Sequence, residues 1–350
     1  MPSLTAPLRR TVTCTGLLVA AMRLDAQAPI VVEQTSGTTA LLQAVSAVSE
    51  KIVWVSGHSG AVLRSLDGGA TWLIRPVPGA ERLQFRDIHA LSADVAWIMS
   101  AGDGPASTIY RTTDGGATWT RQFLNADSIA FYDCITMFDV KHGIAFSDAP
   151  DGKLRILRTE DGEHWNLLPT TGLPPALKGE GGYAASGGCV VSVGERNGWI
   201  AAGTPQSRVW RTTDAGMSWE VFPTPLASGP GVGVAAVAFR DANHGIAVGG
   251  RSGSRADTTS AAVATTDDGG RTWTLRGRPP PGSLYGVSWV PGGGTLTALA
   301  AATGGLMLTR DAGDTWTALS TNQYWSVGAF GSFAWAVGPG GRITRVEFPR

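Results

Sequence analysis

Thr112-Thr113-Asp114-Gly115-Gly116-Ala117-Thr118-Trp119 is the stretch that decides the fold, because variants of it recur along the whole chain. The other five copies end in tryptophans spaced like Trp119, namely Trp72, Trp165, Trp219, Trp273 and Trp316. A short pattern that returns every 40 to 55 residues indicates an architecture of repeated structural units.

Each part of this pattern has a role in a tight turn between two strands. An aspartate accepts hydrogen bonds from turn amides, glycine adopts a positive φ, and Thr-Trp starts the next strand with a large apolar anchor. We therefore interpret the aspartates as structural turn residues, because a catalytic group is needed once and a turn in every unit. They are Asp67, Asp114, Asp214, Asp268 and Asp311.

The third copy departs from the others. It reads RTEDGEHW from Arg158 to Trp165, with Arg158 in the Ser/Thr position and either Glu160 or a shifted Asp161 in the Asp position. The sequence therefore predicts a remodelled third turn.

We call each copy of this pattern a box. Aligning the repeats on the boxes shows a second set of equivalent residues further upstream, and this set has seven members. All are β-branched, as a buried strand prefers: Val45, Ile88, Ile135, Val190, Val237, Val287 and Val327. Two further strand-like runs separate this column from each box, as in residues 95–102 and 108–114, and the box leads into a fourth run. Four short strands repeated seven times predict an all-β, seven-bladed β-propeller.

The seventh unit ends at residues 341–348 without a box or a fourth strand. Residues 30–34 precede the first inner strand and have no partner in the pattern. We therefore predict that this N-terminal strand closes the ring as the outer strand of the last blade, which removes exposed sheet edges.

The N-terminus resembles a secretory signal. A basic segment precedes an apolar stretch and the small-x-small site Ala26-Gln27-Ala28, which predicts a cleaved signal peptide at 1–28 and a single propeller at 29–350. No other segment approaches the length of a membrane span, so we expect a protein that is periplasmic or secreted and not inserted in a membrane.

Cys134 and Cys189 remain in the predicted mature chain. A disulfide is possible in an oxidising compartment. However, both occupy the same place on neighbouring inner strands, where equivalent side chains point the same way round the ring. We therefore favour two buried free thiols over a disulfide.

Composition excludes several classes of function. The 28 basic and 28 acidic residues balance, which gives no electrostatic signature of nucleic-acid binding. The five histidines show no metal-ligand spacing, and no glycine-rich phosphate loop opens a helix, so we expect no metal and no cofactor. Asp133 and Asp148 are candidate acids for a glycosidase, although any surface of this size offers such a pair by chance.

The boxes resemble the Asp-box, or BNR, repeat of sialidase-like propellers. Runs such as AWIMSAG with TIYRTTDGGATW, and HGIAVGG with TTDDGGRTW, are similar to the photosystem II stability/assembly factor family of seven-bladed propellers. The resemblance implies a non-enzymatic scaffold that holds a protein partner. The alternative that it leaves open is an Asp-box glycoside hydrolase.

The face of a propeller opposite the box turns carries the loops that vary most in this chain, such as 168–185, 222–233 and 249–260. Variable loops on a rigid scaffold are where binding usually occurs. We expect a monomer with no catalytic residues and a protein partner of unknown identity that docks on this face. The candidate binding residues are Arg82, Arg86, Asp133, Arg276, Arg278, Tyr285 and Trp325, with Arg251 and Arg255 near them.

Overall fold

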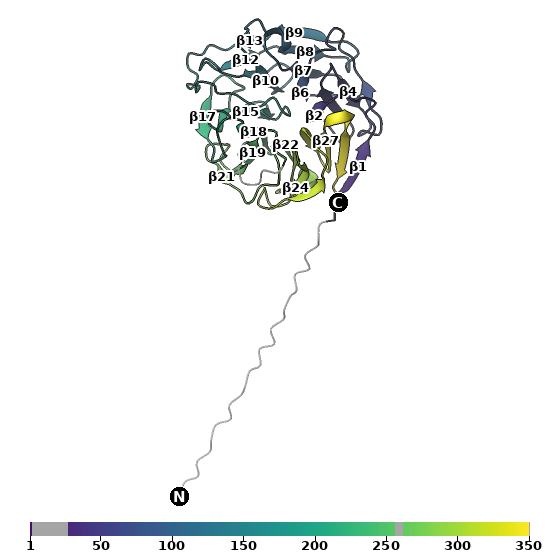
Figure 1. Ribbon diagram of the computed structural model, residues 1–350, viewed down its shortest axis with the longest axis vertical. Helices are drawn as coiled ribbons and strands as arrows, with labels where there is room; N and C mark the ends of the chain where they lie inside the picture. Colours follow the sequence, from purple (N-terminus) through teal and green to yellow (C-terminus); the bar gives the residue numbers. More distant parts are fainter. Residues whose placement is uncertain (2–26, 256–261, 350) are drawn as a thin grey trace.

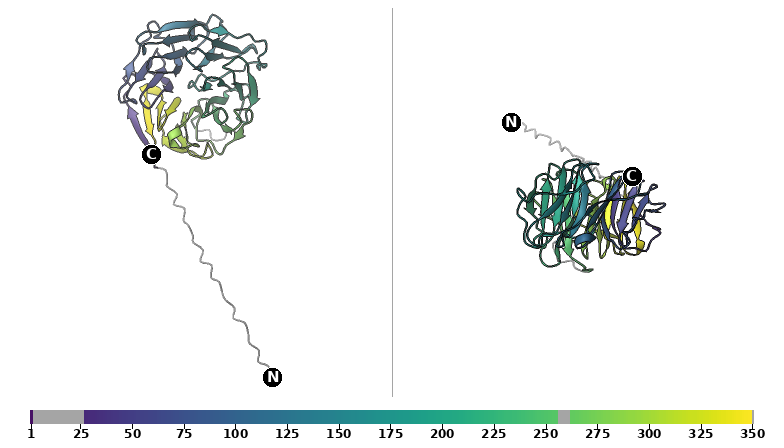
Figure 2. Two further views of the ribbon diagram at one scale, coloured as in Figure 1. Left: turned by 180° about the vertical axis from the view of Figure 1, so that it is seen from behind. Right: turned by 90° about the horizontal axis from the view of Figure 1, so that it is seen from above.

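The chain folds into a closed ring of radial β-sheets around a central axis (Figure 1, and from behind and above in Figure 2). This computed structural model describes Met1 and residues 27–255 and 262–349. Within them, 28 strands form seven antiparallel four-stranded sheets. The predicted seven-bladed propeller is therefore confirmed.

The strands of each blade follow one another from the axis outward. Blades 1 to 3 contain β2 (Leu42–Ala47), β3 (Val53–Gly57), β4 (Val62–Ser65) and β5 (Leu73–Ile74); β6 (Phe85–Ala90), β7 (Ala96–Ser100), β8 (Thr108–Thr112) and β9 (Thr120–Leu124); and β10 (Tyr132–Met137), β11 (Gly143–Ser147), β12 (Arg155–Thr159) and β13 (Asn166–Leu167).

Blades 4 to 6 repeat this order. They contain β14 (Val190–Val193), β15 (Asn197–Ala202), β16 (Arg208–Thr212) and β17 (Glu220–Pro223); β18 (Val232–Phe239), β19 (Gly245–Arg251), β20 (Val263–Thr266) and β21 (Thr274–Leu275); and β22 (Leu284–Trp289), β23 (Ala298–Ala302), β24 (Gly305–Thr309) and β25 (Thr317–Ser320). The described helices are short 3-10 turns: η1 (Gly104–Ala106), η2 (Pro291–Gly293) and η3 (Pro339–Gly341).

Blade 7 joins the two ends of the chain. Its strands β26 (Ser326–Phe330), β27 (Phe333–Val337) and β28 (Ile343–Glu347) are completed by β1 (Ile30–Gln34), which lies at the rim beside the C-terminus (Figure 1). The register runs from Ile30 opposite Glu347 to Gln34 opposite Ile343. The predicted closure of the ring by the N-terminal strand is confirmed.

The hydrophobic core lies between the blades. Seven clusters of buried side chains each join two neighbouring blades, so the ring has no single centre of packing. Second-strand tryptophans, such as Trp97 and Trp199, are fully buried and donate to the box turn of the next blade, at Gly162 O (3.1 Å) and Gly269 O (2.8 Å). Together with Trp335, which donates to Gly68 O at 3.0 Å, these bonds fix the box turns of blades 3, 5 and 1 to the preceding blade.

The boxes form the turns between the third and fourth strands, as predicted, all on one face of the ring, which we call the box face. In blade 5, Asp268 accepts hydrogen bonds from Thr266 Oγ1 (2.8 Å), Thr272 N (2.9 Å) and Thr272 Oγ1 (2.6 Å). Four other boxes repeat this geometry around Asp67, Asp114, Asp214 and Asp311. The six box tryptophans are buried or partly buried in the cores between blades.

The third box is remodelled, as predicted, and the structure settles its frame. Thr159, not Arg158, holds the hydroxyl position, and Asp161 accepts from it at 3.2 Å. The turn is one residue shorter than the others, so His164 N and Nδ1 reach Asp161 at 2.8 and 2.7 Å where the other boxes use Thr or Ser. Glu160 instead pairs with Arg158.

We predict that Asp268→Ala lowers the free energy of unfolding by about 1 to 2 kcal/mol at pH 7, because it leaves turn amides without an acceptor. Hydrogen bonds to the turn lower the pKa of Asp268 to about 2, although burial opposes this shift. Since an unfolded aspartate titrates near 3.9, the difference between wild type and variant should be complete above about pH 4 and disappear toward pH 2.

The matched control is Asp267→Ala, because Asp267 is an exposed carboxylate in the same turn without a hydrogen-bond or ion-pair partner among the described residues. Chemical denaturation of both variants across this pH range tests the prediction. Equal losses for the two variants would show that Asp268 has no special role.

The expectation of free thiols is wrong, because Cys134 and Cys189 form a disulfide with a Cα–Cα distance of 5.9 Å. Cys134 lies in β10 directly after a β-bulge, and Cys189 immediately precedes β14, where its carbonyl accepts from Ala201 N at 2.8 Å. The bond itself shows that the two side chains turn toward each other and do not point the same way round the ring. Both side chains lie in the core between blades 3 and 4.

The predicted signal peptide, 1–28, lies mostly outside the described residues and stays a prediction. None of the helices within 27–255 and 262–349 is long and apolar enough to cross a membrane.

Candidate functional site

β-Bulges place a ring of charged, polar, apolar and aromatic side chains at one end of the central channel. We call the face opposite the boxes the loop face; the inner strands begin there. Five of them carry a bulge in their first four residues, and the extra residues are Gln43, Arg86, Asp133, Ala235 and Tyr285. Trp325 precedes β26 at the equivalent place. Because a bulge redirects a side chain, four predicted binding residues (Arg86, Asp133, Tyr285 and Trp325) come to the same end of the channel.

A segment of blade 4, residues 183–188, spans this end of the channel. Ala184 O accepts from Gln43 Nε2 of blade 1 at 2.9 Å. Ser186 Oγ donates to Tyr285 O of blade 6 at 2.5 Å, and Ser186 O accepts from Ser326 Oγ of blade 7 at 2.8 Å. Gly187 lies so close to blade 2 that a Cβ there would come within 2.2 Å of Asp87 Oδ1. We call this segment the plug.

The channel behind the plug is a cavity of about 310 Å³ whose walls are the inner strands. Asp87, Ser186, Gly187 and Gly188 line its loop-face end. Asp87 is buried, and its two oxygens accept from Ile88 N and Ile135 N at 2.7 Å each. Asp87 therefore ties the inner strands of blades 2 and 3 together, which is a structural role.

Two carboxyl groups meet beside the plug. Asp133 is 2% exposed and lies beside Asp148, and its Oδ2 has no hydrogen-bond donor among the described residues. Asp148 Oδ1 accepts from Gly182 N at 3.1 Å, next to the plug. Burial raises the pKa of both groups, and the charge of Asp148 raises that of Asp133 further. Burial and the neighbouring charge therefore favour the neutral form of Asp133.

Arg86 and an aromatic pair flank the two acids. Arg86 donates Nε and Nη2 to Gln84 Oε1 at 3.0 and 2.5 Å, and its guanidinium lies 6.0 Å from the centre of the Phe131 ring. Tyr285 and Trp325 stack in parallel with centroids 4.5 Å apart. Tyr285 is only 5% exposed, and its hydroxyl accepts from Gly253 N at 2.9 Å. Tyr285 thus supports a loop and does not face solvent, in contrast to the direct binding role that we expected for it.

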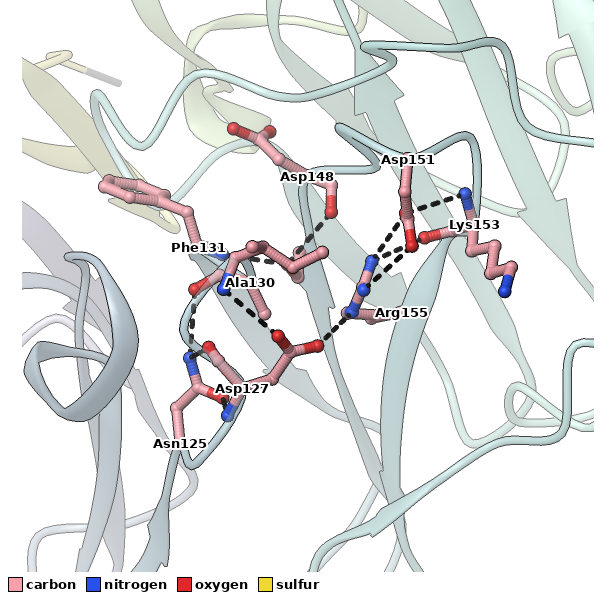
Figure 3. Close-up of polar contacts among 10 residues, drawn as sticks. Asn125, Asp127, Ala130, Phe131, Asp148, Asp151, Lys153 and Arg155 are labelled. Atoms are coloured by element: carbon pink, nitrogen blue, oxygen red, sulfur yellow. Dashed lines mark hydrogen bonds and ion pairs between the residues drawn. The ribbon is translucent and has the colours of Figure 1, made fainter.

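An ion-pair network holds the loops beside Asp148 (Figure 3). Arg155 donates Nε to Asp127 Oδ2 at 2.7 Å and Nη1 to Asp151 Oδ1 at 3.0 Å. Asp148 N in turn donates to Phe131 O at 3.1 Å. The network therefore fixes loops 125–131 and 148–154 and positions Phe131 and Asp148 at the loop-face end of the channel. We call this end, with Arg86, Asp133, Tyr285 and Trp325 around it, the mouth.

Sequence reasoning missed Gln43, Phe131, Arg155 and Tyr183 as parts of this region. Tyr183 is partly buried in the plug, and its hydroxyl group has no hydrogen-bond partner among the described residues. The local sequence contains no sign of the plug, because its hydrogen bonds join residues of different blades.

The remaining candidates lie elsewhere. Arg82 is exposed in the loop between β5 and β6, and Arg278 is exposed between β21 and β22. The expectation that Arg276 lies among the binding residues of the loop face is wrong. It donates Nε to Thr265 Oγ1 at 2.6 Å and lies 3.5 Å from Asp314 in the next box turn. It directly follows β21, on the outer side of the blade, and therefore supports the box face instead of the mouth.

Neither a known family profile nor a curated protein matches this chain. Among solved structures it is similar to "YCF48 bound to D1 peptide", with a TM-score of 0.64 and 16% identity over 93% of this chain and 99% of that one. YCF48 from Cyanidioschyzon merolae gives 0.62 and 18% over 91% and 98%. The GH74 xyloglucanase from Xanthomonas campestris gives 0.62 and 15%, covering 90% of this chain and 53% of the enzyme. At these identities the likeness shows the fold alone.

Proposed function

We propose that this chain is an exported, non-enzymatic propeller scaffold that binds a segment of a partner protein on its loop face. The observation that carries the proposal is the mouth itself, where an arginine, a stacked aromatic pair and a buried acid pair meet on a rigid ring. Arginine and aromatic residues are enriched where single side chains dominate protein binding. The fold is shared with a propeller solved with a bound peptide.

The exposed part of this face supplies the contacts that a partner would meet first. Ile129 is 53% exposed on the loop that carries Phe131, and Arg82 is exposed on the loop that leads to Arg86. Trp325 and Arg86 are partly exposed behind them. Asp133 and Tyr285 are buried, so they shape the mouth and hold its loops instead of docking directly.

We predict that Arg82→Ala combined with Ile129→Ser weakens peptide binding at least tenfold, because truncating an interface anchor typically costs about 2 kcal/mol. The probes are peptides selected from a random phage-displayed library on the wild-type protein. The matched control is Arg271→Ala with Met217→Ser on the box face, where Met217 is 61% exposed. Both double variants should melt as the wild type does. Stronger loss in the box-face variant, or failure to select any peptide, would overturn the proposal.

The alternative is a glycoside hydrolase. Retaining and inverting enzymes separate their carboxyl groups by about 5 to 5.5 Å or 6.5 to 9.5 Å, leaving room for a sugar carbon or a water. Asp133 is 2% exposed and lies beside Asp148, so the two carboxyl groups do not flank an open site that a sugar could enter. Incubation with xyloglucan, β-glucans and sialosides tests this alternative, and turnover that Asp148→Asn abolishes would establish it.

A further inference from the structure

The shortened third box changes what the box face offers to a ligand. In the other boxes the last hydroxyl is used internally, as in Thr118 Oγ1, which donates to Asp114 Oδ2 at 2.6 Å. In blade 3 an imidazole takes this place, and its Nδ1 lies 2.7 Å from Asp161 Oδ2. Because a carboxylate only accepts, Nδ1 carries the hydrogen, and Nε2 is left to face solvent. The His164 side chain is 78% exposed.

His164 borders a cleft between blades 2 and 3 with a volume of about 400 Å³. Its other walls come from β8, β9 and the box turn of blade 2, and from Glu163 beside His164 in blade 3. They are lined by Arg111, Thr113, Thr118, Thr120, Arg121, Gln122 and Glu163. All of these side chains are polar. The cleft is therefore suited to a ligand that is recognised by hydrogen bonds and charge.

The charges in the cleft leave one cation unpaired. Arg111 Nη1 lies 3.0 Å from Glu163 Oε1, and Asp161 is paired with His164. Arg121 is exposed and has no acidic partner in the described part of the chain. With a neutral His164 the two arginines, Arg111 and Arg121, balance the two carboxylates, Asp161 and Glu163. Protonation of His164 therefore gives the cleft a net positive charge.

We propose that this cleft is a binding site for an oxyanion, a sulfate, phosphate or carboxylate group on a small ligand. Arg121 supplies the charge and paired N–H donors, His164 donates from Nε2, and the hydroxyl groups of Thr113 and Thr120 complete the set. This site is independent of the mouth, because it lies on the opposite face. The other boxes lack it, because their last side chain has no donor to spare.

The His164 donor requires a protonated ring, so binding should depend on pH. The hydrogen bond and charge of Asp161 raise the pKa of His164. Asp161 and Glu163 on its own turn and Arg111 and Arg121 on blade 2 are the charged groups that face it. Oxyanion affinity should therefore rise as the pH falls through the range in which histidine titrates.

The experiment is a titration of the full chain with sodium sulfate at pH 5.5 and 8, followed by the NMR signals of the His164 ring at constant ionic strength. Sulfate keeps its charge over this range, so a change in affinity reports the protein. We expect saturable binding that is about fivefold tighter at pH 5.5, and a loss of about fivefold to tenfold in Arg121→Ala. His164→Gln should remove the pH dependence, which can be followed by calorimetry.

The matched control is Arg271→Ala, which removes one positive charge from the box turn of blade 5, where the arginine lies 3.8 Å from Glu220. It should bind sulfate as the wild type does. Parallel titrations with phosphate and acetate rank the oxyanions that the cleft accepts. The proposal is overturned if Arg271→Ala weakens binding as much as Arg121→Ala, or if the shifts grow linearly without saturation.

Discussion

A chain that begins at Ser36 is expected to melt on the order of 10 °C below one that begins at Pro29, because it lacks the strand that closes the ring. The missing β1 supplies a complete ladder to β28. It also joins blade 7 to blade 1 through the side chain of Gln34. Gln34 Nε2 donates to Gly68 O at 3.1 Å, and Gln34 Oε1 accepts from Trp72 Nε1 at 3.3 Å. About five lost hydrogen bonds, each contributing about 1 kcal/mol, amount to about 5 kcal/mol.

The chain that begins at Pro29 is the control, because it removes the predicted signal peptide and keeps β1 whole. Scanning calorimetry and urea denaturation of both chains measure the difference. The shorter chain should also associate, since β28 becomes an exposed sheet edge. Identical melting curves would mean that β1 contributes nothing to closure.

Replacing both cysteines, Cys134→Ala with Cys189→Ala, should lower the free energy of unfolding by about 4 kcal/mol. The disulfide closes a loop of 55 residues, and cross-links of this length restrict the unfolded chain by about that amount. Both side chains are fully buried, and alanine leaves only a small void in their place. Denaturation with and without dithiothreitol measures the effect.

Two controls separate the disulfide from the loss of side-chain volume. Reduced wild type should unfold like the double variant, and dithiothreitol should leave the double variant unchanged. If oxidised and reduced wild type have the same stability, the cross-link does not hold blades 3 and 4 together. A further expected sign is greater amide exchange in the plug, because Cys189 immediately follows it.

The candidate site shows where prediction from sequence ended. Arg86, Asp133, Tyr285 and Trp325 could be grouped because they occupy equivalent places in the repeats, and the structure does bring them to one end of the channel. Their surroundings were not predictable. Asp133 and Tyr285 are buried by loops of other blades, and Arg276 turns outward because it follows the outermost strand of its blade.

The amino-acid sequence by itself determined the blades, the box turns and the closing strand, because hairpin geometry and alternating burial depend on residues only a few positions apart. Tertiary structure alone decided the disulfide, the plug and the mouth. The plug bonds to residues 141 and 99 positions away, at Gln43 and Tyr285. Such contacts depend on how seven blades pack around one axis, and on bulges that redirect single side chains, which local sequence patterns do not encode.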